Sequence, residues 1–342
     1  MPLSFTFLMC SERSGSNLIT RMFDAHPDCC GPSPTHLVRI LAENRGRYGD
    51  LSADGPWREL CSDAAEILAT KVGRWQREWT AADLQRAVPR RSLAAPLRTV
   101  FAAEAKSAGK AHLFIKENHL HRSLPLVQRA FPGARIVAMV RDPRDMALSW
   151  QQSDVLRGGV VRAARVWRAD QDALLQVLNC LVRGRDIHLL RYEDLVSAPG
   201  PTLDAACAFV GLPPDPAMLD FHREDGATVQ ASSSEAWRNL DRPLMSGNFH
   251  KWRDGLTPDQ LTWVEAVCSG AMEAFGYRPE TSAPADLAGL EARLTAAEPW
   301  DKPGWARVSA AEQAARRRRE TVVGRIAARP LVPHFDLEPA HA

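Results

Sequence analysis

The chain has 342 residues, of which 45% are apolar and 25% charged, enough for one large α/β domain or two smaller ones. Its 43 Lys and Arg against 41 Asp and Glu leave a net charge of +2, which removes the global argument for a nucleic-acid-binding protein. Seven cysteines without a CxxC spacing, no apolar run near the ~18 residues of a membrane span, and no signal-peptide pattern predict a cytoplasmic protein without structural zinc.

Short apolar segments alternate with helical segments over most of the chain. Buried strands are predicted at residues 4–9, 112–116, 135–140 and 187–190. Helices are predicted at residues 17–25, from His36 onward, over much of 57–108, from Asp142 onward, at 161–181 and at 257–276. Strands that alternate with helices indicate βαβ units, and therefore an α/β fold with a parallel sheet.

The pattern weakens beyond Arg278, in a segment rich in proline. Residues 279–342 are predicted to form an appendage with a helical piece around 305–328. We expect it to pack on the main domain or on a second subunit, which leaves a homodimer open. The run of four arginines at 316–319 could bind an anionic surface, but acidic neighbours on both sides favour a solvated helix face.

Residues 10–18, Cys-Ser-Glu-Arg-Ser-Gly-Ser-Asn-Leu, connect the first predicted strand to the first predicted helix. The free N–H groups and the dipole of a helix start favour an anion at this position. Arg13 supplies positive charge, Gly15 lets a ligand approach the backbone, and the hydroxyls of Ser14 and Ser16 add donors. The segment is not a Walker A motif, because the Lys and the magnesium-binding hydroxyl are missing. A turn that only caps the helix is the alternative.

A second anion site is predicted after the strand at 135–140. Arg141 lies at the carboxyl end of that strand, where ligands bind in open α/β sheets. Ser149 follows about two turns into the next helix, so both side chains are expected to reach one anionic group. An Arg–Asp ion pair with a solvated helix start is the alternative interpretation.

Together the two segments resemble the sulfotransferase superfamily that uses 3′-phosphoadenosine 5′-phosphosulfate (PAPS), in the Arg-Ser-Gly form of its carbohydrate, tyrosylprotein and many bacterial members. Three further segments are similar to family motifs in the expected order: 190–195 (Leu-Arg-Tyr-Glu-Asp-Leu), 247–252 and 257–277. The resemblance implies a P-loop-like three-layer α/β fold with a central parallel sheet and a helical C-terminal extension. It implies a sulfotransferase domain at 1–278, with a helical acceptor-side region at 37–110, and an extension at 279–342.

The resemblance also implies in-line transfer of a sulfuryl group from PAPS to an acceptor hydroxyl, without a metal. The residues implied to bind PAPS are Arg13, Ser14, Gly15, Ser16, Asn17, Leu18, Arg141, Ser149, Tyr192 and Lys251. Arg13 would also stabilise the departing oxygen, and Lys116 would contact the transferring sulfate. The expected partner is a small-molecule or glycan acceptor, such as a sugar, a lipid-linked sugar or a secondary metabolite.

Two histidines are candidates for the general base that removes the proton of the hydroxyl. Tyrosylprotein-type members have a Glu where this chain has Pro34, and His36 is the nearest titratable residue of the same loop. Cytosolic members place a His shortly after the equivalent of Lys116, which favours His119. A neutral imidazole, with an ordinary pKa of about 6.5, suits this role near neutral pH.

Two other functions remain open at this point. A P-loop nucleotide kinase would share the anion-binding loop, but the missing Walker Lys disfavours it. A nucleotide-binding module without turnover would keep Arg13, Arg141 and Ser149 and lack a usable base, as Pro34 at the family's Glu position allows.

Overall fold

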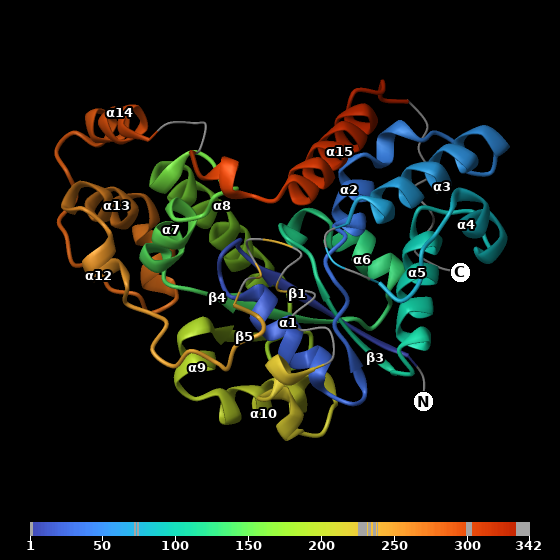
Figure 1. Ribbon diagram of the computed structural model, residues 1–342, viewed down its shortest axis with the longest axis horizontal. Helices are drawn as coiled ribbons and strands as arrows, with labels where there is room; N and C mark the ends of the chain where they lie inside the picture. Colours follow the sequence, from blue (N-terminus) through green and yellow to red (C-terminus); the bar gives the residue numbers. More distant parts are fainter. Residues whose placement is uncertain are drawn as a thin grey trace.

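The computed structural model describes residues 3–71, 73, 75–224, 231, 234, 237, 239–298 and 303–332. One parallel sheet lies between two layers of helices (Figure 1). Its strands are β1 (Ser4–Cys10), β2 (Cys29–Cys30), β3 (His112–Lys116), β4 (Arg135–Val140) and β5 (Ile187–Arg191). They are arranged in the order β2-β3-β1-β4-β5, and every neighbouring pair is parallel.

The α-helices of the described chain are α1 (Ser16–Ala25), α2 (Leu37–Glu43), α3 (Asp54–Ala69), α4 (Ala81–Ala87), α5 (Ala94–Ser107), α6 (Leu124–Ala130), α7 (Pro143–Gln151), α8 (Gly159–Cys180), α9 (Tyr192–Ser197), α10 (Pro199–Val210), α12 (Trp252–Gly255), α13 (Pro258–Ala274), α14 (Leu287–Ala297) and α15 (Ala310–Ala327). Short 3₁₀ turns are η1 (Arg45–Arg47), η2 (Leu120–Arg122), η3 (Pro216–Met218), η4 (Phe221–Arg223) and η6 (Pro303–Arg307). None of the described helices is long and apolar enough to cross a membrane.

Helices cover both faces of the sheet, and its strands are therefore continuous runs of apolar residues. Along β1, Phe7 and Met9 pack into one core with α2, α3, α5, α7, α8 and α13. Leu8 and Cys10 point to the other face and pack with α1 and α10. The predicted α/β fold with a central parallel sheet is confirmed, and so are its four apolar strands.

Strand β2 was not predicted, because two residues are too short to form a recognisable apolar run. Its residues, Cys29 and Cys30, are buried free thiols at the edge of the sheet beside β3. Burial raises the pKa of Cys30 to about 12, so this thiol is unreactive at neutral pH.

The parallel register brings several chain segments to one edge of the sheet. Leu8 of β1 is opposite Lys116, the last residue of β3, and Val140 of β4 is opposite Arg191 of β5. The segments that follow these strands therefore leave the sheet side by side at its carboxyl edge. This is the edge at which ligands bind in open α/β sheets.

The segment after residue 278 packs on the rest of the same chain. α14 lies against α13, and α15 lies across α3, with Ile326 fully buried (Figure 1). Arg329 forms ion pairs with Asp63 and Glu59 of α3. Of the two expected arrangements, packing on the main domain is the one seen within this chain.

Candidate active site

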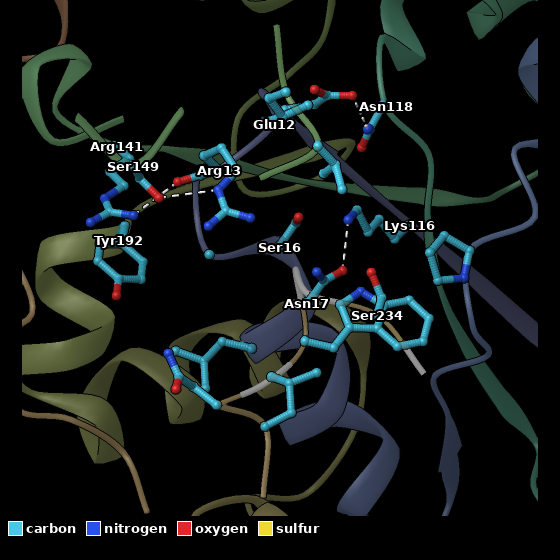
Figure 2. A pocket seen from close by; sticks show the side chains of 18 of the residues that line it. Glu12, Arg13, Ser16, Asn17, Lys116, Asn118, Arg141, Ser149, Tyr192 and Ser234 are labelled. Carbon is cyan, nitrogen blue, oxygen red and sulfur yellow. Dashed lines mark hydrogen bonds between the residues drawn. The ribbon is translucent and has the colours of Figure 1, made fainter. Parts of the chain in front are cut away.

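A cavity of about 520 Å³ lies at the carboxyl edge of the sheet. Most of the predicted site residues line it, namely Arg13, Gly15, Ser16, Asn17, Leu18, His36, Lys116, Arg141, Ser149, Tyr192 and Lys251. Figure 2 shows part of this set, including Arg13, Lys116 and Arg141. Among the described lining residues, seven are Arg or Lys and two, Glu12 and Asp145, are acidic. A chain of net charge +2 therefore gathers a strong local excess of positive charge.

The loop before α1 is shaped to receive an anion. Its backbone takes the left-handed conformation at Arg13 (φ 60°) and Gly15 (φ 88°). In the described chain, no side chain caps the N-terminus of α1, and its first turn carries no acidic residue. The N–H groups of this turn and the helix dipole are thus available to a ligand.

Gly15 is also required by its neighbour. A Cβ atom on Gly15 would lie 2.3 Å from Cδ2 of Tyr192, far inside van der Waals contact. The absence of a side chain lets the Tyr192 ring cover the loop, so the two predicted motifs fit together at this point.

The two predicted anion sites form one continuous surface. Arg13 Nε donates to Ser149 Oγ at 3.1 Å, and Arg141 Nη1 donates to the carbonyl of Arg13 at 2.9 Å (Figure 2). The Arg141 guanidinium carbon lies 4.3 Å from the centre of the Tyr192 ring, a cation–π distance. Asn248 donates from Nδ2 to the Tyr192 hydroxyl at 2.7 Å, which fixes the ring.

The other arginine of this segment, Arg144, has a structural role. It is buried in ion pairs with Asp142 and Glu265, and Asp142 also caps α7 by accepting from the Arg144 N–H. The ion-pair interpretation therefore holds for Arg144, whereas Arg141 faces the cavity.

Lys116 approaches the loop from β3. Its Nζ donates to Asn17 Oδ1 at 2.7 Å, and in the view of Figure 2 Ser16 lies between it and Arg13. Burial lowers the pKa of Lys116. The cavity thus contains cationic groups on both sides of the N-terminus of α1.

His36 lines the cavity and has a buried carboxylate behind it. The residue adopts a left-handed conformation (φ 52°), and its Nδ1 lies 3.5 Å from Glu117 Oε2. Neither atom has a hydrogen-bond partner among the described residues. Burial, assisted by the charges of Arg319 and Arg39, lowers the pKa of His36 well below 6.5, so the ring is neutral at pH 7.

Glu117 was not among the predicted site residues. Its side chain is fully buried, and Oε1 accepts from the Val38 N–H at the start of α2. Burial raises the pKa of Glu117 to about 7. The available signal was its place beside Lys116, but the segment Lys-Glu-Asn-His departs from the family patterns used to interpret it.

Two predicted residues do not reach the main cavity. His119 lies at a separate cavity of about 10 Å³, where its Nδ1 pairs with Asp170 at 2.8 Å. Ser14 is fully buried, and its hydroxyl has no partner among the described residues.

The lining of the cavity differs from expectation in two respects. Among the described lining residues only Thr70 comes from 37–110, whereas several come from 234–251 and from α15. Interpretation of the arginine run as a solvated face is wrong for Arg316 and Arg319, which line the cavity; Arg317 and Arg318 are exposed. Residues three apart on a helix share a face, which is why the run divides in this way.

Comparison with known proteins gives consistent matches. Residues 6–216 match the model of the sulfotransferase family. The chain is 23% identical over 319 residues to carbohydrate sulfotransferase 6 of Homo sapiens, with 80% of each chain covered. It is 25% identical over 294 residues to protein-tyrosine sulfotransferase 1 of Danio rerio, with 83% of this chain and 74% of that protein covered.

Solved structures give the same result for the fold. The sulfotransferase domain from the Synechococcus PCC 7002 olefin synthase superposes with a TM-score of 0.59 at 21% identity, covering 81% of this chain and 96% of that one. The sulfotransferase domain from the curacin biosynthetic pathway gives a TM-score of 0.57 at 20% identity, covering 81% and 99%. These likenesses show a shared fold.

Proposed function

Because the chain belongs to the sulfotransferase family, we propose that it moves the sulfuryl group of PAPS to the hydroxyl of a small-molecule or glycan acceptor. The observation that carries the proposal is that Arg13, Lys116, Arg141 and Lys251 line one cavity together with the start of α1, which no described side chain caps. PAPS has a sulfate and two phosphate groups, and this local excess of cations on a nearly neutral chain suits it.

The residues present fit such a donor. Arg13 and the N–H groups of the loop would hold the 5′-phosphate, while Arg141, Ser149 and Lys251 would hold the 3′-phosphate. When bound, PAPS supplies an activated sulfuryl group whose sulfur–oxygen bond to phosphate breaks as the bond to the acceptor oxygen forms. Arg13 and Lys116 stabilise the negative charge that moves onto the phosphate oxygen.

We propose that His36 is the general base that removes the proton of the acceptor hydroxyl. Its ring lines the cavity and is neutral at pH 7, and Glu117 lies behind Nδ1, where a carboxylate stabilises the imidazolium that forms. His119 remains the alternative, but its position outside the main cavity favours His36.

Binding of the product nucleotide tests the donor site. We expect Arg141→Ala to weaken the affinity for adenosine 3′,5′-bisphosphate by about tenfold or more in calorimetry, because it removes a charged contact. Arg129→Ala, at an exposed position of α6, is the control and should bind normally. Transfer of label from PAPS to candidate acceptors is measured in parallel.

Unchanged nucleotide affinity in Arg141→Ala would reject the proposed donor site. Tight binding without transfer to any acceptor would instead favour a nucleotide-binding module without turnover.

A further inference from the structure

The cavity extends to a helix that lies outside the family match. Ala315, Arg316 and Arg319 of α15 line it, whereas the family model ends at residue 216. α15 is held on the domain by apolar packing of Ile326 and by the Arg329–Asp63 ion pair. A segment of the C-terminal extension is therefore part of the wall of the site.

This wall lies away from the residues assigned to the nucleotide. Arg319 donates to the carbonyl of Thr35, next to His36, in the loop that follows β2. His36 lies 3.5 Å from Glu117, which follows β3, whereas Arg141 follows β4, two strands further along the order β2-β3-β1-β4-β5. With about 4.8 Å between neighbouring strands, the two ends of the cavity are roughly 10 Å apart. α15 thus closes the end of the cavity that an acceptor would occupy.

The two arginines of this wall differ in their partners. Arg316 pairs with Glu312 at 2.7 Å, so its charge is compensated within α15. Arg319 has no carboxylate within 4.0 Å among the described residues. It donates to two backbone carbonyls, those of Thr35 and Ile67, and keeps further N–H groups for a ligand.

The guanidinium of Arg319 is partly removed from water, so the lack of a counter-ion raises the free energy of its charged form. The side chain is half-buried, and burial lowers its pKa to about 10, so it still carries its charge at pH 7. Glu117 favours this charge from a distance, while Arg39 opposes it. A desolvated guanidinium without an ion partner is strongly stabilised when a bound anion supplies one.

We propose that Arg319 binds an anionic group of the acceptor, a carboxylate, phosphate or sulfate, so that the acceptor is a hydroxyl compound with a negative charge close to the hydroxyl that receives the sulfuryl group. The inference rests on the proposed function, because it takes His36 as the neighbour of that hydroxyl. Arg319 acts in acceptor specificity and takes no part in the transfer itself.

Matched pairs of probes test this proposal. The pairs are 3-hydroxybutyrate, 4-hydroxybenzoate and glucuronate, each with its uncharged methyl ester. Their affinities are measured by ligand-observed NMR on the full chain, both with saturating adenosine 3′,5′-bisphosphate and without it. We expect at least one acid to bind about tenfold more tightly than its ester.

Three variants assign that preference to Arg319. Arg319→Gln should remove the preference and leave the affinity of the ester unchanged. Arg319→Lys keeps the charge and should retain part of it. Arg318→Gln changes the same residue type at the exposed neighbouring position and should behave like the unmodified protein. Loss of the two carbonyl contacts could also displace α15. In that case Arg319→Gln would lower the affinities of acid and ester together, and only Arg319→Lys would restore the preference for the acid.

The proposal is overturned if no acid is preferred, if the preference survives in Arg319→Gln, or if the Lys and Gln variants lose it equally. The proposed function has a separate readout, because failure of the bisphosphate to bind leaves the measurement without nucleotide intact. A preference for acids without nucleotide binding would therefore reject the donor and keep the anion site.

Discussion

Glu117 provides a direct test of the arrangement behind His36. The carboxyl group is fully buried, and burial raises its pKa from the ordinary value of 4.5 to about 7. Replacement by Gln keeps the size and the oxygen that accepts from the Val38 N–H, and it removes the charge. We expect Glu117→Gln to make the protein more stable at alkaline pH and less active.

The magnitude follows from proton linkage. The folded state binds the Glu117 proton more tightly than the unfolded state, so stability is highest below pH 4.5 and falls as pH rises to about 7. The difference between 4.5 and about 7, at about 1.4 kcal/mol for each pKa unit, amounts to about 3 kcal/mol. This is a large fraction of the free energy of unfolding of a typical domain, which is roughly 5–15 kcal/mol.

Urea unfolding of both proteins at pH 5 and pH 8 measures this effect. The stability advantage of Glu117→Gln should be about 2 kcal/mol or more larger at pH 8 than at pH 5. Glu273→Gln, the same substitution at an exposed position of α13, controls for the chemical change itself. An advantage that is equal at the two pH values would refute the buried, proton-binding carboxyl.

Activity gives the second half of this prediction. His36 is already neutral through this pH range, so a rise in kcat through about pH 7 reports ionisation of Glu117. Glu117→Gln should lose that rise and lower kcat by about tenfold or more, because no carboxylate then stabilises the imidazolium. If the variant keeps both its rate and the rise near pH 7, Glu117 does not assist His36.

Two further predictions concern the base and the loop. His36→Ala should lower the rate of sulfuryl transfer by about 10²-fold or more and leave the nucleotide affinity nearly unchanged. His119→Ala should change the rate little. The reverse result would show that His119 is the base. Gly15→Ala should destabilise the protein and weaken nucleotide binding more than Gly109→Ala, measured by thermal unfolding and calorimetry. Both glycines have positive φ (88° and 70°), but only a Cβ on Gly15 meets Tyr192, so equal effects would contradict that contact.

Much of the fold was predictable because its signals are local. Runs such as residues 136–140 are apolar on both faces. Thr257 and Pro258 mark the start of α13, where Thr257 and Gln260 form a capping box. β2 and α14 were missed for physical reasons. β2 forms only through pairing with β3, and α14 begins at the Asp286 cap directly after a proline-containing segment that suggested irregular chain.

The part of the cavity around Arg13 and Arg141 was predictable, and the part around Glu117 and Arg319 was not. Motifs that follow strands of a parallel sheet meet at one edge, which is sufficient to bring Arg13 and Arg141 together. Glu117 and Arg319 act through contacts between distant segments, at 38 and 117 and at 35 and 319. Sequence spacing does not encode such contacts. Helix periodicity alone, however, could have predicted that residues 316 and 319 lie on one face and residues 317 and 318 on another.

The acidic residues of the same motifs explain how the cavity stays positive. Asp145 accepts from the backbone N–H groups of His250 and Trp252, on either side of Lys251, and Glu193 accepts from the N–H of Asp142. Carboxylates that hold backbone segments in this way do not pair with the cavity's arginines, and they fix the loop that carries Lys251 against α7. In these segments Asp145 and Glu193 therefore position the backbone, while Arg141 and Lys251 line the cavity.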